Sequence, residues 1–316
     1  LSILWVPKNW AAFLALFIFA KVGYSCSLIF YDSMLSDVTS PERMDVVSSN
    51  GYAWGYIGSC IPFLVSLVIV LMNESLGISM STAMMIAFII NAVWWIGCTI
   101  PLLKNYKQIH YASEKPVNVV GNTFKKLGET FKKILTQKKI MLFLIAFFFY
   151  IDGVYTIIDM ATAYGSALGL DTTGLLLALL VTQIVAFPSA LVIAKLSKKM
   201  EASKLIKISI LAYTAIAIFA VQLDKQWEFW LLAVCVGLFQ GGIQALSRSY
   251  FAQIIPADNS GEYFGIYDIC GKGASFMGTA LVSLVAQISG SANGAIAIIA
   301  VMFLIGFAFF NKSLKA

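Results

Sequence analysis

An aspartate and a lysine interrupt the stretch "EYFGIYDICGKGASFMG", which runs from Glu262 to Gly278 and is otherwise mostly apolar or small. Asp268 and Lys272 are four residues apart, so on a helix they share one face and neutralise each other. An uncompensated charge at the centre of a bilayer costs about 3 kcal/mol or more. The pair must therefore face protein or a water-filled cavity. One interpretation is a neutral pair that fixes its helix against a neighbour; the one we favour is a cavity-lining pair that titrates or exchanges partners.

Two further carboxylates, Asp152 and Asp159, lie seven residues apart in "YIDGVYTIID". That spacing is two helical turns, so both side chains point to one face. A carboxylate in a low dielectric holds its proton more tightly, so we predict that both line the cavity and carry a coupling proton. In the alternative, Asp159 lies nearer the external mouth of the cavity, solvated and without a role.

Gln240, Gln244 and Arg248 form a stripe with four-residue spacing in "FQGGIQALSR". Glutamine offers donors and acceptors that suit a zwitterionic or hydroxylated solute, although it also bonds neighbouring helices. The fork of Arg248 suits a carboxylate clamp at a gate, with Glu262 or Asp268 as partner. An ordinary basic anchor at the membrane surface is the alternative.

An acidic cluster around Arg43 looks like the matching ion-pair gate of the first half of the chain. Its members are Asp37, Glu42 and Asp45.

Three more candidates come from the first two apolar segments. Asp32 is a gate candidate beside Tyr31, and Lys21 is expected to face the cavity or to pair with an acidic residue on one of the expected upstream spans. Asn50, with Tyr52 and Trp54, is a candidate for lining the cavity.

The elements that hold these residues must be membrane-spanning helices. The chain has 316 residues, of which 59% are hydrophobic and 12% charged, whereas a soluble domain carries about a quarter charged residues. Apolar runs long enough to cross a bilayer recur nine times, and such spans must be helical because lipid offers the backbone no partners. They lie near 10–31, 46–72, 78–103, 140–163, 172–195, 204–223, 227–249, 262–288 and 292–311. The predicted fold class is an all-α membrane protein.

The basic residues predict the orientation. If the loop 104–139 is cytoplasmic, 18 of the 22 Lys and Arg residues fall on the cytoplasmic side. Only Lys8 and Lys225 fall on the other side, and Lys21 and Lys272 lie inside spans. The net charge of +6 is then a topology signal that needs no nucleic-acid partner. We expect the linker and the C-terminus to be cytoplasmic.

The sequence lacks the residues that several functional classes require. The five cysteines all fall in predicted spans with no close pair, and His110 is the only histidine. The sequence therefore offers no residues for a zinc site, a histidine-based triad or a glycine-rich phosphate loop. We expect no metal, no cofactor and no enzyme activity.

The polar, lysine-rich segment 104–139 separates three spans from six. We divide the chain into 1–103, the end of an N-terminal bundle, the linker 104–139, and a six-span C-terminal bundle, 140–316. Within the linker, "NTFKKLGETFKKILTQKK" places its apolar residues on one helical face and its lysines away from it. Such a helix lies on an anionic leaflet, either as a tether or as a regulatory element.

A shift of 220 residues aligns special positions in the two parts: Ser27 with Ser247, Glu42 with Glu262, Gly51 with Gly271, and Gly58 with Gly278. Parallel six-span halves are a known transporter plan with the solute site between the halves. We therefore expect three further spans upstream of this chain, twelve in all.

Three segments carry a family resemblance. They are "FYDSMLSDVTSPERMDVVSSNGYAWGYIG" (30–58), "FLIAFFFYIDGVYTIIDMATAYG" (143–165) and "GLFQGGIQALSRSYFAQIIPADNSGEYFGIYDICGKGASFMG" (237–278). They closely resemble the vacuole-effluxer branch of the major facilitator superfamily, which includes fungal autophagy-linked vacuolar amino-acid exporters and bacterial relatives. The chain resembles spans four to twelve of twelve. The loop "AKLSKKMEASK" (194–204) departs from the superfamily's loop signature, because Ser197 replaces the usual acidic residue.

The resemblance implies a secondary active transporter that works by alternating access and moves small polar solutes such as amino acids, as efflux. A coupling proton or sodium ion and the lipid bilayer are the expected partners, and we expect the complete protein to be a monomer. The alternatives are a cation-coupled sugar symporter of the same architecture and a membrane sensor or scaffold that transports nothing. Lysine-rich, arginine-poor usage hints at a bacterial plasma membrane.

Overall fold

The computed structural model describes residues 10–110, 119–289 and 292–316, and in these ranges every regular element is helical. Nine helices of the described chain are long and apolar enough to cross a membrane, which confirms the predicted fold class. The elements are α2 (Trp10–Ser33), α3 (Leu35–Val38), η1 (Pro41–Arg43), α4 (Met44–Leu71), α5 (Met80–Asn105), α6 (Val119–Thr136), α7 (Lys138–Ala167), α8 (Thr172–Leu196), α9 (Ala202–Ala220), α10 (Gln226–Ile254), η2 (Ala257–Asn259), α11 (Ser260–Ser289) and α12 (Ala292–Lys315).

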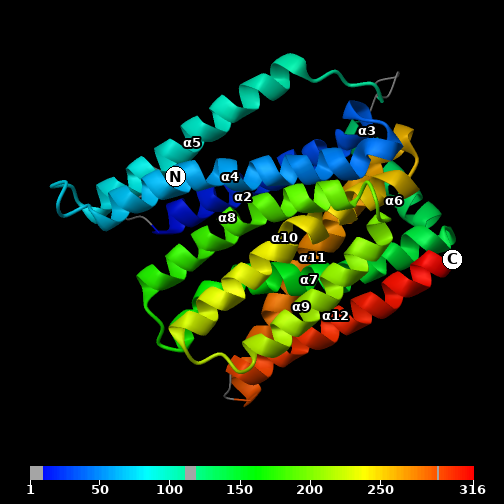
Figure 1. Ribbon diagram of the computed structural model, residues 1–316. Helices are drawn as coiled ribbons and strands as arrows, with labels where there is room; N and C mark the ends of the chain where they lie inside the picture. The colour runs from blue at the N-terminus through cyan, green and yellow to red at the C-terminus, as the bar shows by residue number, and fades with distance from the viewer. Residues whose placement is uncertain (1–9, 111–118, 290–291) are drawn as a thin grey trace.

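The helices form two groups, with α6 beside one end of them (Figure 1). The first helix group is α2 to α5 and the second is α7 to α12. α4 packs against α8 and α10, and α2 packs against α11, so these helices form the boundary between the groups.

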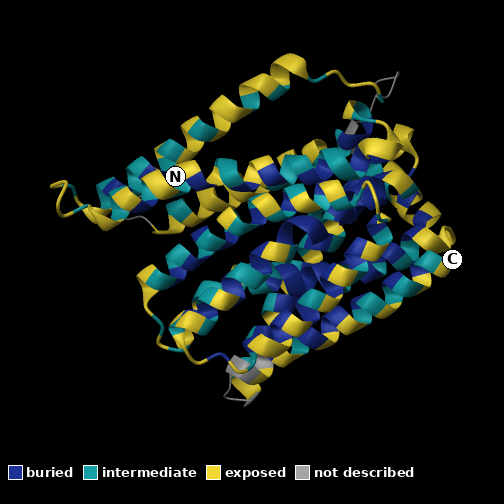
Figure 2. Ribbon diagram, in the orientation of Figure 1, coloured by how far each residue is buried: buried dark blue, intermediate teal, exposed yellow. Residues whose placement is uncertain are grey.

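The core lies in the second helix group (Figure 2). Phe143, Tyr150, Tyr213, Phe303 and Phe310 are fully buried there. By contrast α2 has no buried residue, and α5 buries only two alanines. The second group is therefore the more closely packed of the two, while the first presents more apolar side chain to its surroundings.

Glycines bring helices of the second group into close contact. A Cβ on Gly153 of α7 would lie 2.6 Å from the ring of Phe303 on α12, and one on Gly237 of α10 would lie 2.7 Å from the carbonyl oxygen of Thr182 on α8. Small residues of this kind let helix backbones approach in a membrane.

Helix α10 extends beyond its predicted end. The apolar pattern ends near residue 249, whereas the helix continues to Ile254. The added turn carries the buried Tyr250 and Phe251, and its Gln253 bonds Asp45 of the first helix group. Contact with another helix, which a hydropathy pattern does not contain, stabilises this turn.

The amphipathic helix expected in the linker is α6. Its Leu127, Thr130 and Ile134 face the second helix group, and Phe124 and Phe131 are exposed. Part of the predicted linker, residues 111–118, lies outside the described residues.

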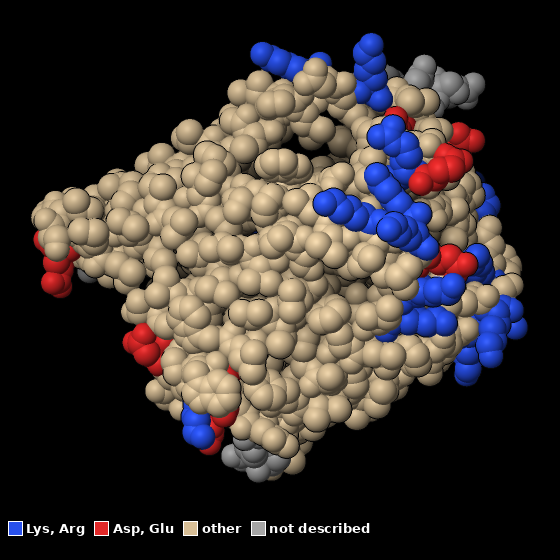
Figure 3. All heavy atoms as spheres, in the orientation of Figure 1, with Lys and Arg blue, Asp and Glu red and all other residues tan. Residues whose placement is uncertain are grey.

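Lysines and arginines gather at the end of the molecule where α6 and the C-terminus lie (Figure 3). We call this the basic end. Lys8, which was assigned to the opposite side, lies outside the described residues.

Candidate functional site

A cavity of about 960 Å³ lies between the two helix groups. The first group contributes α2 and α4 to its wall, and the second contributes α7, α8, α10 and α11. We call it the central cavity. Its polar and charged lining residues are Lys21, Tyr24, Ser25, Tyr31, Asp32, Tyr52, Tyr56, Ser59, Tyr155, Asp159, Gln183, Gln244, Tyr267, Asp268, Lys272, Ser275 and Thr279.

Asp268 and Lys272 both lie in this wall. Lys272 donates to the carboxylate of Asp268, and its Nζ also donates to the backbone carbonyl of Ser25 on α2 at 3.1 Å. The two side chains are 40% and 18% exposed, so the pair is accessible from the cavity. Lys272 therefore bonds an acid of its own helix and a backbone group of the other helix group.

Asp159 and Lys21, also in the cavity wall, make fewer contacts than Lys272 does. Asp159 accepts a hydrogen bond from Ser275 Oγ at 3.1 Å, and Lys21 Nζ lies 5.7 Å from the centre of the Tyr24 ring. Gln244 also lines the cavity, where the hydroxyl of Tyr56 donates to its Oε1 at 3.3 Å.

Six tyrosines of the described chain line the cavity, and the sequence singled out only two of them, without a role for their rings. The six are Tyr24, Tyr31, Tyr52, Tyr56, Tyr155 and Tyr267. A signal existed, because Tyr24 and Tyr31 are seven apart and Tyr52 and Tyr56 four apart, so each pair shares a helix face.

Arg248 sits at the basic end of the cavity and joins the two helix groups. Its Nη1 lies 3.0 Å from Asp32 Oδ1 on α2, its Nε donates to Ser48 Oγ at 3.0 Å, and its Nη2 donates to the Ser48 carbonyl at 3.3 Å. The rings of Tyr31 and Tyr52 lie 5.2 and 4.8 Å from its Cζ, within cation–π range. Arg248 is thus held on several sides at a buried position.

Glu262 and Asp268 were predicted as the partners of Arg248, and that prediction was wrong. Glu262 accepts from Thr130 of α6 at 2.6 Å, at the beginning of α11, and Asp268 is bonded to Lys272. The acidic partner of Arg248 is instead Asp32, from the first helix group.

The ion-pair cluster expected around Arg43 does not form among the described residues. Asp45 accepts from Ser249 Oγ at 2.5 Å and from Gln253 Nε2 at 3.0 Å, both on α10. Asp37 bonds elsewhere, and no ion pair of Arg43 occurs in the described ranges. Short segments, α3 and η1, separate these acids and turn them toward different neighbours.

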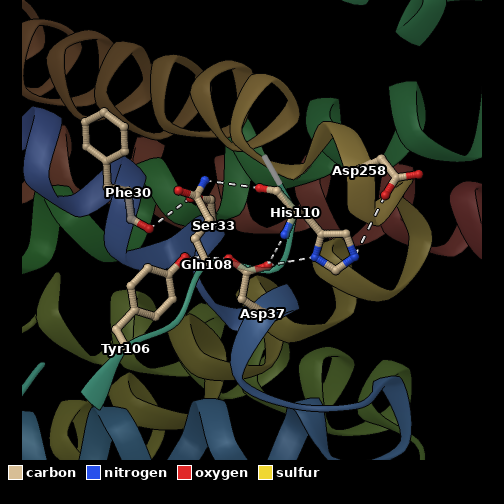
Figure 4. A network of polar contacts seen from close by, with 7 residues as sticks. All are labelled: Phe30, Ser33, Asp37, Tyr106, Gln108, His110 and Asp258. Carbon is tan, nitrogen blue, oxygen red and sulfur yellow. Dashed lines mark hydrogen bonds and ion pairs between the residues drawn. The ribbon is translucent and has the colours of Figure 1, made fainter. Parts of the chain in front are cut away.

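Asp37 anchors a polar network at the basic end (Figure 4). It accepts from the Tyr106 hydroxyl, from the backbone N–H of His110 at 3.0 Å, and contacts His110 Nδ1 at 2.7 Å. Burial and the bond to Asp37 raise the pKa of Tyr106 to about 12. On its other side, His110 Nε2 lies 3.9 Å from Asp258 Oδ1 in η2. The network fixes the chain after α5 against α3.

Three predicted cavity residues lie elsewhere. Asn50 is absent from the cavity wall, because the cavity face of α4 carries Tyr52, Tyr56 and Ser59. Gln240 is buried at a smaller apolar pocket between α7, α8 and α10. Asp152 is fully buried between α7 and α11.

Comparisons with known proteins agree with this arrangement. The family model described as "Vacuole effluxer Atg22 like" matches residues 1–313. The chain is 41% identical over 301 residues to the uncharacterized MFS-type transporter YxiO of Bacillus subtilis, covering 95% of this chain and 70% of that protein. It is 26% identical over 282 residues to autophagy-related protein 22-1 of Aspergillus niger, covering 82% of this chain and 45% of that protein. The chain thus spans about half the length of this fungal relative.

A solved structure supports the fold. The major facilitator superfamily transporter FucP, in the outward conformation, superposes with a TM-score of 0.69 at 14% identity, over 99% of this chain and 78% of that one. Nine apolar helices in the described ranges, the likeness to an MFS structure and the family match lead to one conclusion: this multi-pass membrane protein belongs to the vacuole effluxer Atg22-like family of MFS-type transporters.

Proposed function

We propose that the protein transports a small solute that carries both a positive and a negative group, with amino acids as the leading class, through the central cavity by alternating access. The observation that supports this most is the bonding of Lys272, which reaches Asp268 on its own helix and the Ser25 carbonyl of the other helix group. A zwitterion offers an acid to Lys272 and a cation to Asp268. Its binding then changes a contact between the groups, which is what a ligand needs in order to shift their equilibrium.

Arg248 and Asp32 form the gate at the basic end in this proposal. Asp45 with Ser249, and Ser48 with the Ala245 carbonyl at 2.7 Å, join the same two groups there. All of these bonds must break for the cavity to open at this end. The state described here is therefore closed at the basic end in this proposal.

We place the basic end on the cytoplasmic side of a bacterial plasma membrane. The asymmetry of lysines and arginines supports this orientation, and the family description as an effluxer supports export. Single cysteines at Lys199 and Lys225 test it: the first should react with a membrane-impermeant reagent only from inside, and the second only from outside. Reversed labelling would overturn the orientation.

A sugar is the second candidate. The six tyrosines of the cavity wall, with Gln183 and Gln244, offer ring faces and amides of the kind that hydroxylated solutes use. A second solved structure of the same fold, with a TM-score of 0.54, is titled a fucose:proton symporter.

Counterflow into proteoliposomes, with labelled amino acids and labelled sugars compared, decides between the two. We expect amino-acid counterflow that Lys272→Gln abolishes, while Lys225→Gln, a matched change outside the cavity, leaves it intact. Counterflow of sugars alone would favour the second candidate. A protein that exchanges neither class, and gains no thermal stability from either, would contradict both.

A further inference from the structure

Asp152 is a carboxyl group without an ionic partner in the interior of the second helix group. Its side chain is fully buried, at the middle of α7. Oδ1 accepts the backbone N–H of Gly278 on α11 at 3.0 Å and the hydroxyl of Thr156 at 3.3 Å, whereas Oδ2 has no hydrogen-bond partner among the described residues.

Among the residues that the structure describes, no charge nearby compensates an ionised Asp152. None of the ion pairs in the described ranges includes it. Asp159 and Tyr155, on its own helix, both line the cavity. The charged side chains on the described helices packed against α7 either bond elsewhere or are exposed. Asp268 bonds Lys272, Arg248 bonds Asp32, Glu262 bonds Thr130, and Glu228 bonds the N–H groups of Asp224 and Lys225. The exposed ones are Lys195, Lys312, Lys315, Glu129 and the lysines of α6.

Burying an ionised carboxylate without a partner is costly, and in practice such a group takes up a proton. The hydrogen bonds agree with a neutral acid, because Oδ1 is the acceptor of both and serves as the carbonyl oxygen. The partnerless Oδ2 then carries the proton. We propose that Asp152 is a proton-binding site, occupied in this conformation, whose proton is released when α11 separates from α7.

The geometry provides the link to movement. Gly278 allows the α11 backbone to reach the carboxyl, since a Cβ at that position would collide with Asp152 Oδ1. The flanking residues Ile151, Tyr155 and Thr279 line the cavity, so the carboxyl lies one layer behind the cavity wall. Water reaches Oδ2 only if this layer opens. On release the Oδ2–H bond breaks, its electron pair stays on the oxygen, and the proton passes to cavity water; uptake is the reverse.

The role as a coupling site rests on the proposed transport function, whereas the protonation itself does not. Infrared spectroscopy of the full-length protein in proteoliposomes tests the protonation directly. At neutral pH we expect a protonated-carboxyl C=O band that shifts on deuteration and is absent in Asp152→Asn. Asp159→Asn, a matched change at a cavity carboxyl, should keep it. A band of full intensity in Asp152→Asn would overturn the proposal.

Two further measurements keep the test decisive. If Asp152→Asn does not fold, Asp152→Glu should move the band instead of removing it, and an unmoved band would count against the site. In transport, a pH gradient should drive accumulation by the wild type, and Asp152→Asn should lose that accumulation while it retains counterflow. Counterflow without any response to a pH gradient in the wild type would overturn the coupling role of Asp152 and leave the proposed function intact.

Discussion

The guanidinium of Arg248 and the carboxylate of Asp32 lie 3.0 Å apart although 216 residues separate them in the chain. The pair joins α10 of the second helix group to α2 of the first, at the basic end of the central cavity. Arg248 is almost completely buried, at 4% side-chain exposure, and Asp32 is 20% exposed. A pair in this position is expensive to break by removal of one partner, because the other charge is left buried.

Arg248→Ala is therefore expected to destabilise the state described here by about 3 kcal/mol, the lower end of the range for buried pairs, since Asp32 keeps some solvent contact. Arg248→Lys should recover little, because an ammonium does not reproduce the fork that reaches both Asp32 and Ser48. Thermal unfolding of Arg248→Ala, of Asp32→Asn and of the double variant measures the coupling between the two side chains. Additive single effects would show that the two side chains do not act as a pair.

Asp268 and Lys272 should behave differently, because they are partly exposed to the cavity. Losing such a pair costs about 0.2–1 kcal/mol, so Lys272→Ala and Asp268→Asn should both fold. The double variant separates a structural pair from a transport pair. If the pair only joins helices, the double variant recovers stability and flux. We expect it to recover stability while accumulation against a gradient stays lost. Full accumulation in proteoliposomes would reject the transport role.

The sequence predicted the membrane spans well, because each span is a local property of about twenty residues. It also predicted the contact of Asp268 with Lys272, which a single helix turn provides. It did not predict the partners of Arg248 and Arg43. Those depend on which helices of two distant segments meet, and charge type alone leaves every acid as a candidate.

Asn50 and Asp152 were predicted to line the cavity and do not, because this also depends on how the helices pack. Both lie in the correct helices, but the side of a membrane helix that faces a cavity is not marked by hydropathy, since lipid-facing and protein-facing surfaces are similarly apolar. The cavity face of α4 was marked instead by Tyr52, Tyr56 and Ser59, whose spacing follows one helix face.

Gly237 is expected to set the separation of α8 and α10. Gly237→Ala places a Cβ 2.7 Å from a backbone oxygen of Thr182, and a backbone cannot rotate away, so we expect a loss of about 1–3 kcal/mol. Gly58→Ala in α4 is the matched control, because no atom lies within 4 Å of its added Cβ. It should be neutral or stabilising by about 0.4–1 kcal/mol. Thermal unfolding measures both, and equal effects would contradict the packing argument.

The network of Asp37 and His110 has two unequal sides. Asp37 accepts three hydrogen bonds from the segment after α5, whereas the contact of His110 with the second helix group is a 3.9 Å approach to Asp258, whose side chain is 92% exposed. A charged acceptor is worth about 1.5–3 kcal/mol for each bond it makes, while exposed ion pairs contribute little. The network should therefore order residues 106–110 rather than hold the two helix groups together.

Hydrogen exchange and spin-label distances distinguish these roles. Asp37→Ala should speed amide exchange in 106–110 by about tenfold or more, since every 1.4 kcal/mol is a factor of ten. The distance between spin labels on α4 and α10 at the basic end should stay unchanged, because Arg248, Ser48 and Asp45 still join the groups there. Asp258→Asn should change neither measurement. A population with separated basic ends in Asp37→Ala or Asp258→Asn would show instead that His110 takes part in the gate, because only a contact between the groups can shift their equilibrium.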